Sequence, residues 1–235
     1  MIDKKKMVKN LNKWSFDNMP EPYDEHLSRS IPLYKESQFF IQKLSSFYIK
    51  DRNINYEIGC ANGTIIGDLA KLYVNFLNTK FVGIDLSSNL IDEAKERYKE
   101  VPNLEFIQGN ASAYKFKQCN LAIIHYCLQF MTMEEKNTLL SSLYKNLIES
   151  GAVIIFEKTL LPDSYSQEVF SGIYTDFKFD NDYSTREVID KSVSLRAVMR
   201  VSSSNDNIVF FKSIGFKSIY TFFKWGPFEG YLCVK

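Results

Sequence analysis

Short apolar segments alternate with longer amphipathic segments between residues 55 and 157 of this 235-residue chain. The segments between the apolar runs carry large apolar side chains at helical spacing, as in Ile65, Ile66 and Leu69. Strands that alternate with helices form a parallel sheet with right-handed crossovers and with helices on both faces. The sequence therefore predicts an α/β, doubly wound, Rossmann-like fold. The expected strands are residues 55–58, 80–85, 104–108, 120–126 and 152–157.

The segments outside this alternation complete the predicted domain. Residues 1–34, with prolines at 20, 22 and 32, are expected to be irregular backbone that side-chain packing holds in place, and a first helix is expected over 37–49. Two closing strands would form an antiparallel edge pair in a seven-stranded, mostly parallel sheet. We expect a single domain over 1–235, with an N-terminal cap over 1–50 and a helical lid over 160–204. The later elements are expected helices at 164–177, 184–199 and 205–214, and strands at 217–223 and 230–234.

Composition excludes several classes of protein. Lys and Arg number 29 and Asp and Glu number 28, so the net charge of +1 gives no field that would attract a polyanion. The apolar runs are far shorter than the roughly 20 residues that cross a bilayer, and the N-terminus lacks a secretory h-region. The four cysteines form no C-x-x-C pair, so we expect neither a disulfide framework nor a metal site. We expect a cytoplasmic protein without membrane contact.

The turn after the first expected strand, Glu57-Ile58-Gly59-Cys60-Ala61-Asn62-Gly63, is the main candidate for ligand binding. In open α/β sheets, ligands lie at the carboxyl ends of the strands, against this strand–turn–helix unit. The turn lacks the G-x-G-x-x-G and Gly-Lys-Ser/Thr patterns that hold pyrophosphate and triphosphate groups. Asp85 ends the second strand, where its carboxylate could accept hydrogen bonds from ribose hydroxyls. The pattern indicates a nucleoside cofactor without a pyrophosphate, although each feature alone also fits ordinary packing or solvation.

Polar residues follow two further strands. Asn110 could meet the edge of an adenine, or it could simply form a turn after Gly109. His125 is a candidate general base because the ordinary pKa of histidine is near neutrality. It could equally be a buried, hydrogen-bonded histidine or a contact to the cofactor. Glu157 at the end of the fifth strand is expected at the rim of the site, with an exposed acidic–basic pair, Glu157 and Lys158, as the alternative.

Residues 56–159 resemble the S-adenosylmethionine core of the class I methyltransferases. Over residues 14–235 the chain also resembles the bacterial carboxy-S-adenosyl-methionine synthases, which convert S-adenosylmethionine, with prephenate as carbon dioxide donor, into a carboxylated sulfonium used to modify wobble uridine of tRNA. The segments that carry this second resemblance are Phe16-Asp17, Arg29-Ser30-Ile31-Pro32, Tyr34, Leu128-Gln129-Phe130, Glu157-Lys158, Asp176-Phe177-Lys178, Asn181, Tyr183-Ser184, Glu187, Lys191, Leu195 and Val198-Met199.

The resemblance implies S-adenosyl-L-methionine as the cofactor, and a homodimer. Tyr34 is expected to fold over the cofactor tail. The implied cofactor-binding residues are Tyr34, Glu57, Gly59, Cys60, Ala61, Gly63, Asp85, Leu86, Asn110, Ala111 and His125. The chain departs from the synthases where an arginine that grips the added carboxylate follows the equivalent of Lys191, because it has Ser192 there. Arg196 or Arg200, about one helical turn or more beyond, could supply a guanidinium instead.

The leading functional prediction is an S-adenosylmethionine-dependent transferase that moves a methyl group to a small-molecule acceptor. His125 is the candidate base, Arg29 could orient an anionic acceptor or be an ordinary solvated residue, and Glu157 completes the predicted catalytic set. One alternative is a true carboxy-S-adenosyl-methionine synthase, and a second is a non-catalytic binding module that keeps the cofactor fold. Residues 1–13 contain five lysines and one aspartate, which fits a solvated tail, so nucleic acid is not expected as the direct substrate.

Overall fold

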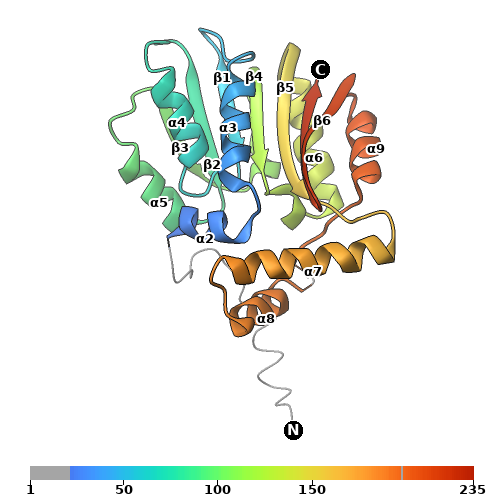
Figure 1. Cartoon of the computed structure of the whole chain (residues 1–235). Helices are drawn as coiled ribbons and strands as arrows, with labels where there is room; N and C mark the ends of the chain where they lie inside the picture. Colours follow the sequence, from blue (N-terminus) through green and yellow to red (C-terminus); the bar gives the residue numbers. More distant parts are fainter. Residues whose placement is uncertain (1–21, 197) are drawn as a thin grey trace.

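The computed structural model describes residues 22–196 and 198–235 and has a seven-stranded sheet at its centre (Figure 1). The strand order is β3-β2-β1-β4-β5-β7-β6, in which β7 is antiparallel to β5 and β6 and the other pairs are parallel. The prediction of a doubly wound α/β fold with a closing antiparallel pair is therefore confirmed. The strands are β1 (Ile54–Ile58), β2 (Lys80–Asp85), β3 (Leu104–Gln108), β4 (Cys119–His125), β5 (Leu147–Lys158), β6 (Ser218–Trp225) and β7 (Phe228–Val234).

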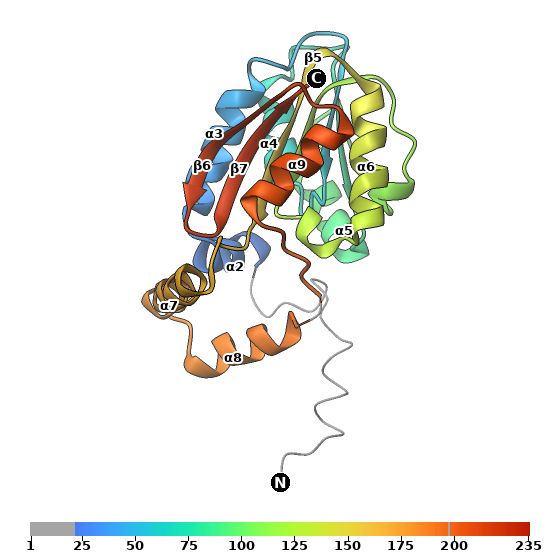
Figure 2. The same cartoon turned by 90° about the vertical axis from the view of Figure 1, so that its right-hand side faces the viewer.

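Helices cover both faces of this sheet. Helices α3, α4 and α5 pack on one face, and α6 and α9 pack on the other (Figures 1 and 2). The central strand β4 is buried along its whole length, and its side chains alternate between the two cores: Leu121 and Ile123 join the first, Ala122 and Ile124 the second. The helix bounds are α2 (Tyr23–Ser30), α3 (Tyr34–Ser45), α4 (Thr64–Leu72), α5 (Ser88–Arg97), α6 (Met133–Asn146), α7 (Ser164–Asp180), α8 (Thr185–Ser194) and α9 (Ser204–Ile214).

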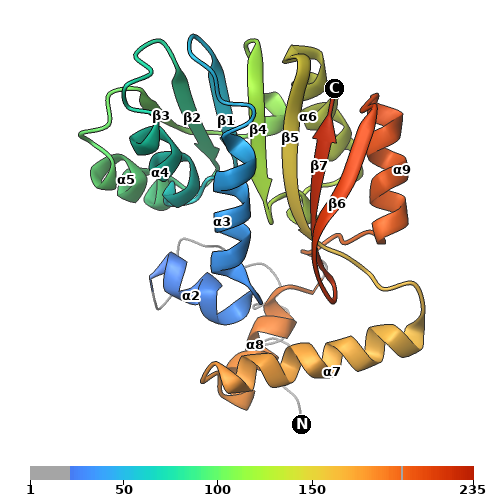
Figure 3. The same ribbon diagram turned by 45° about the horizontal axis from the view of Figure 1, so that its top comes forward.

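Helices α7 and α8 lie beyond the carboxyl ends of the parallel strands, next to α2 (Figure 3). Neither helix buries a residue fully, so both form an outer layer rather than a part of the core. A capping box starts α8: the Ser184 hydroxyl accepts from the amide of Glu187, and the Glu187 carboxylate accepts from the amide of Ser184. The segments that enter and leave this layer run side by side, because Leu160 and Ser203 form a parallel bridge.

Several element bounds differ from the sequence predictions for identifiable physical reasons. Residues 23–30 form the helix α2 instead of irregular backbone, because the prolines flank this helix and do not interrupt it. The expected helix over 184–199 ends at Ser194, and the following backbone pairs with the core through the amide of Arg200, which donates to the carbonyl of Gln129 at 2.7 Å. The expected irregular backbone before residue 22 lies outside the described residues. In the part of the chain that is described, no helix is both long and apolar enough to cross a membrane.

Candidate functional site

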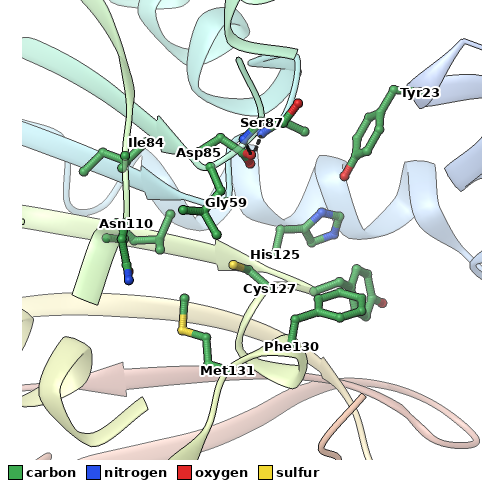
Figure 4. Close-up of a pocket in the computed structure, with 16 residues that line it drawn as sticks. Tyr23, Gly59, Ile84, Asp85, Ser87, Asn110, His125, Cys127, Phe130 and Met131 are labelled. Atoms are coloured by element: carbon green, nitrogen blue, oxygen red, sulfur yellow. Dashed lines mark hydrogen bonds between the residues drawn. The ribbon is translucent and has the colours of Figure 1, made fainter. Parts of the chain in front are cut away.

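A cavity of about 270 Å³ lies at the carboxyl ends of the parallel strands (Figure 4). Four of its lining residues come from four different strand ends: Gly59 after β1, Asp85 on β2, Asn110 after β3 and His125 on β4. The parallel sheet therefore brings together side chains that are far apart in the sequence. Leu86 and Ala111 also line this cavity, as do Ala61 and Met131.

The glycine turn has a backbone that other residues would not adopt easily. Gly59 and Gly63 have φ values of +68° and +75°. A Cβ atom on Gly59 would lie 2.4 Å from Sγ of Cys127, and one on Gly63 would lie 2.4 Å from the ring of Phe106. Gly59 lines the cavity, whereas Gly63 is not among the residues that line it. The first glycine thus presents bare backbone to a ligand, and the second permits close packing of the turn.

The Asp85 carboxylate is fixed at the edge of the cavity by two backbone amides. Its Oδ2 accepts from the amide of Ala61 at 2.9 Å, and its Oδ1 accepts from the amide of Ser87 at 2.9 Å. Each carboxylate oxygen can accept a further hydrogen bond. Asp85 therefore joins the turn after β1 to the end of β2 and presents acceptors to a ligand with hydroxyl groups.

Glu57 and Cys60 are buried residues of the glycine turn. Glu57 is buried, and its Oε2 accepts from the amide of Ile66 at 2.9 Å. Burial raises the pKa of Glu57 well above its usual value, opposed by this hydrogen bond, and burial also raises the pKa of the Cys60 thiol. Neither residue lines the cavity. Of the predicted cofactor-binding residues, these two are placed to hold the turn rather than to touch a ligand.

Asn110 caps a turn and also lines the cavity. Its Oδ1 accepts from the amide of Ser112 at 2.9 Å and so caps the short 3₁₀ helix Ala111–Ala113. Because the carbonyl oxygen serves the turn, the amide nitrogen is the end of this side chain that lies toward Met131 across the cavity (Figure 4). Asn110 can thus form a turn and also donate to a bound ring nitrogen.

His125 is buried and neutral. Its Nε2 lies 2.9 Å from Oγ of Ser37, and this hydroxyl donates to the carbonyl of Tyr34 at 2.6 Å. The Ser37 proton is thereby engaged, so Nε2 carries a proton and donates to Ser37. Burial lowers the pKa of His125 to about 3. Such a group is a weak base at neutral pH, which favours a hydrogen-bonding role over general-base catalysis.

Tyr23, which the sequence patterns did not indicate, lines the cavity, whereas Tyr34 does not. Tyr34 packs behind His125, with ring centroids 5.3 Å apart, and is absent from the cavity lining. Tyr23 on α2 lines the cavity instead (Figure 4). Burial raises the pKa of Tyr23 well above its usual value, so its phenol stays neutral. The nearby prolines gave no signal for this helix, and hence none for the position of Tyr23.

A second cavity of about 550 Å³ lies between α2, α7, α8 and the end of β5. It shares three aromatic lining residues, Tyr23, Tyr126 and Phe130, with the first cavity, so the two meet at an aromatic neck. Four basic residues line the second cavity, and its lining contains no aspartate or glutamate within the part of the chain described. These basic residues are Lys158, Lys178, Lys191 and Arg196.

Two of these lysines flank one aromatic ring. Nζ of Lys158 and Nζ of Lys178 lie 4.5 Å and 4.1 Å from the ring centroid of Tyr174, whose hydroxyl donates to the carbonyl of Ser30 at 2.8 Å. Burial lowers the pKa of Lys158 to about 8, and the charge of Lys178 contributes in the same direction. Two ammonium groups in a partly dehydrated wall favour an anionic ligand, which would relieve their repulsion.

The remaining predicted residues fall in different places. Arg196 and Ser192 line the second cavity, whereas Arg200 does not. Arg29 lies against the loop after α7, where its Nε donates to the carbonyl of Asn181 at 3.0 Å, and it lines neither cavity. Its guanidinium therefore contacts the segment after α7 and lies outside both cavity linings.

Glu157 is not at the rim of the site. It is 1% exposed, and its Oε2 lies 3.6 Å from Nζ of Lys136 on α6. Successive side chains of a strand point to opposite faces, so Glu157 points toward α6 while Lys158 lines the second cavity. Both sequence interpretations of Glu157, a rim residue and an exposed pair, are thus wrong, and its neighbour Lys158 is the residue that lines the cavity.

Comparisons with known proteins agree with this geometry. Residues 56–151 match the family model described as a methyltransferase domain. Among solved structures, a phosphoethanolamine N-methyltransferase 2 of Haemonchus contortus in complex with S-adenosyl-L-methionine aligns with a TM-score of 0.56, at 19% identity, over 79% of this chain and 38% of that one. An O-methyltransferase family protein of Burkholderia thailandensis aligns with a TM-score of 0.60, at 9% identity, over 90% of this chain and 59% of that one.

The fold, the cavity and the domain match define a class: the chain is an S-adenosylmethionine-dependent transferase with the class I methyltransferase fold. The residues fit this cofactor, because Gly59 lines the cavity without a side chain and Asp85 presents carboxylate oxygens at the cavity edge. Within that class the chain is similar to the carboxy-S-adenosyl-L-methionine synthase of Staphylococcus epidermidis, at 28% identity over 94% of this chain and 97% of the relative. The resemblance seen in the sequence is therefore confirmed.

Proposed function

We propose that this protein transfers the methyl group of S-adenosylmethionine to a small anionic acceptor that binds in the second cavity. The observation that carries this proposal is the basic lining of that cavity, which adjoins the cofactor cavity because the two share three aromatic lining residues. When bound, the cofactor supplies an electrophilic sulfonium methyl group. The chain then has two main tasks, to align the acceptor with that group and to exclude water.

The residues divide these tasks between them. Gly59, Asp85 and Asn110 hold the nucleoside at the strand ends, and neutral His125 adds a hydrogen-bonding group. Lys158, Lys178 and Arg196 bind and orient the anionic part of the acceptor in the other cavity. Alignment of this kind contributes up to about 7–11 kcal/mol to catalysis in favourable geometries. Burial lowers the pKa of His125 to about 3, so this residue is a weak base at neutral pH. We therefore expect an acceptor that is already a nucleophile at neutral pH.

A second candidate is the reaction of the carboxy-S-adenosyl-methionine synthases. The similarity to the S. epidermidis synthase over nearly the whole chain favours it, as does the position of Arg196 beside Ser192 in the cavity wall. In this case the guanidinium of Arg196 would bind the carboxylate of the modified sulfonium, with the charge-assisted hydrogen bonds that a serine hydroxyl cannot supply.

Mass spectrometry of the small molecules that copurify with the protein tests both candidates. Methyl transfer predicts S-adenosylmethionine or S-adenosylhomocysteine, and the synthase reaction predicts a sulfonium heavier by one carboxylate. A second assay incubates the protein with methyl-labelled S-adenosylmethionine and a panel of small carboxylates that includes prephenate. Label in a methylated carboxylate, formed with an equal amount of S-adenosylhomocysteine and lost in the Lys158→Met/Lys178→Met variant, supports the proposal. A carboxylated sulfonium formed with prephenate refutes methyl transfer and supports the second candidate.

A further inference from the structure

Helix α2 lies between the two cavities and contributes to both. Tyr23 lines each of them, and Leu27, Ser30 and Ile31 line the second one. Asp24, the residue after Tyr23, lines neither cavity. Its carboxylate nevertheless connects α2 to the turn that forms the cofactor cavity.

Three side chains donate hydrogen bonds to Asp24. Oγ1 of Thr64 lies 2.9 Å from its Oδ2, Nδ2 of Asn62 lies 3.1 Å from it, and Nη1 of Arg97 lies 2.8 Å from it. Asn62 and Thr64 are the two neighbours of Gly63 in the turn, and Asn62 is only 2% exposed. A single carboxylate thus holds α2 against both sides of the glycine and against α5.

The opposite side of α2 holds the outer helices. His26 contacts Lys191 of α8, and its Nδ1 lies 3.1 Å from the hydroxyl of Tyr183. The carbonyl of Ser30 accepts from the hydroxyl of Tyr174 on α7. Helix α2 is therefore tied to the outer layer by several residues, and the hydrogen bonds of Asp24 tie it to the turn after β1. Loss of Asp24 would remove these hydrogen bonds from the end of the helix that carries Tyr23.

We propose that Asp24 is a positioning residue for the cofactor, which holds Tyr23 in the neck between the two cavities. Asp24 acts through Tyr23, since Tyr23 touches the cavity and Asp24 does not. When α2 stays on the turn, the Tyr23 ring forms part of the wall of the cofactor cavity at the neck and shields that side of the cofactor from water. This inference goes beyond the proposed function, because it concerns cofactor binding and holds for either reaction.

A double-mutant cycle tests this coupling, with S-adenosylhomocysteine as the probe and isothermal titration calorimetry as the assay. In the full chain we expect Asp24→Ala to weaken binding roughly tenfold, which corresponds to about 1.4 kcal/mol. Tyr23→Ala should weaken binding by a similar factor, and Asp24→Ala should then cost less than about twofold in the Tyr23→Ala background. The matched control is Glu93→Gln, because Glu93 accepts from the same Asn62 Nδ2 at 3.1 Å but lies on α5. This variant should bind the probe like the wild type.

Equal losses from Asp24→Ala in both backgrounds would overturn the proposal, since Asp24 would then act on the turn directly and not through Tyr23. No loss in the wild-type background would overturn it as well. If Asp24→Ala destabilises the fold, Asp24→Asn provides the same comparison with a smaller perturbation. Hydrogen exchange supplies an independent readout: amides of α2 should exchange faster in Asp24→Ala and at the wild-type rate in Glu93→Gln. Failure of the methyl-transfer proposal would leave all of these outcomes unchanged.

Discussion

Substitution of Gly59 by alanine tests the central feature of the cofactor cavity. The new Cβ would lie 2.4 Å from Sγ and 2.7 Å from Cβ of Cys127. The backbone at Gly59 also has a φ of +68°, which an alanine adopts at a cost of about 1–2 kcal/mol. Overpacking of a closely packed site typically costs about 1–3 kcal/mol. Gly59→Ala should therefore lower the free energy of unfolding by about 2–5 kcal/mol, or less where Cys127 can shift.

The assay is urea unfolding of the ligand-free protein, together with calorimetry of S-adenosylhomocysteine binding. Gly172→Ala is the matched control, because a Cβ on Gly172 meets no atom within 4 Å and this residue lies within α7. The control should be neutral or stabilising by up to about 1 kcal/mol, as expected for alanine in a helix. Cys127→Ala should restore only part of the stability of Gly59→Ala, because the Cβ contact and the backbone cost remain.

Equal stability of Gly59→Ala and Gly172→Ala would refute the argument that close approach and the left-handed backbone demand glycine at position 59. A loss of stability without any loss of probe affinity would refute the placement of Gly59 against the cofactor. We expect the affinity to fall at least tenfold, since the added methyl group would enter the wall of the cavity.

Three further predictions concern residues near the neck and the basic cavity. Tyr126 has a φ of +57°, and its buried hydroxyl has no hydrogen-bond partner among the described residues. Tyr126→Phe should therefore leave the free energy of unfolding unchanged or raise it by up to about 1 kcal/mol in urea titrations. A loss above about 1 kcal/mol would contradict this reasoning. Burial lowers the pKa of Lys158 to about 8, so this residue binds fewer protons in the folded than in the unfolded chain between about pH 8 and 10.4, and it adds stability as pH rises through that range. Lys158→Met should raise the thermal midpoint at pH 7 and weaken its rise toward pH 10, and identical pH profiles would argue against a buried ammonium. Glu157→Gln should lower the free energy of unfolding by roughly 3–5 kcal/mol, because it leaves Lys136 buried without its ion-pair partner. The double variant Glu157→Gln/Lys136→Met should recover most of this loss in the same unfolding assay. If Glu157→Gln is as stable as the wild type, the ion pair contributes nothing to stability.

Local sequence patterns were sufficient to predict the sheet and the cofactor class. Apolar periodicity changes between strand and helix within a few residues. A glycine turn after the first strand and an acidic residue at the end of the second indicate a nucleoside site in such a fold. Gly59, Asp85, Asn110 and His125 accordingly line one cavity, as their places at strand ends required. These features depend only on local sequence and on the rule that ligands of an open α/β sheet lie at the carboxyl ends of its strands. The sequence by itself therefore determined them.

The tertiary structure decided which side chains face the second cavity. Lys158, Lys178 and Arg196 belong to β5, α7 and the turn after α8, and only the packing of these elements brings them to one wall. It also placed Tyr23 rather than Tyr34 at the neck, because α2 docks on the turn through Asp24, a contact between residues far apart in the sequence. Periodicity reports whether a residue lies on a strand or a helix, but the partner of an outer helix is fixed by long-range contacts that no local pattern encodes.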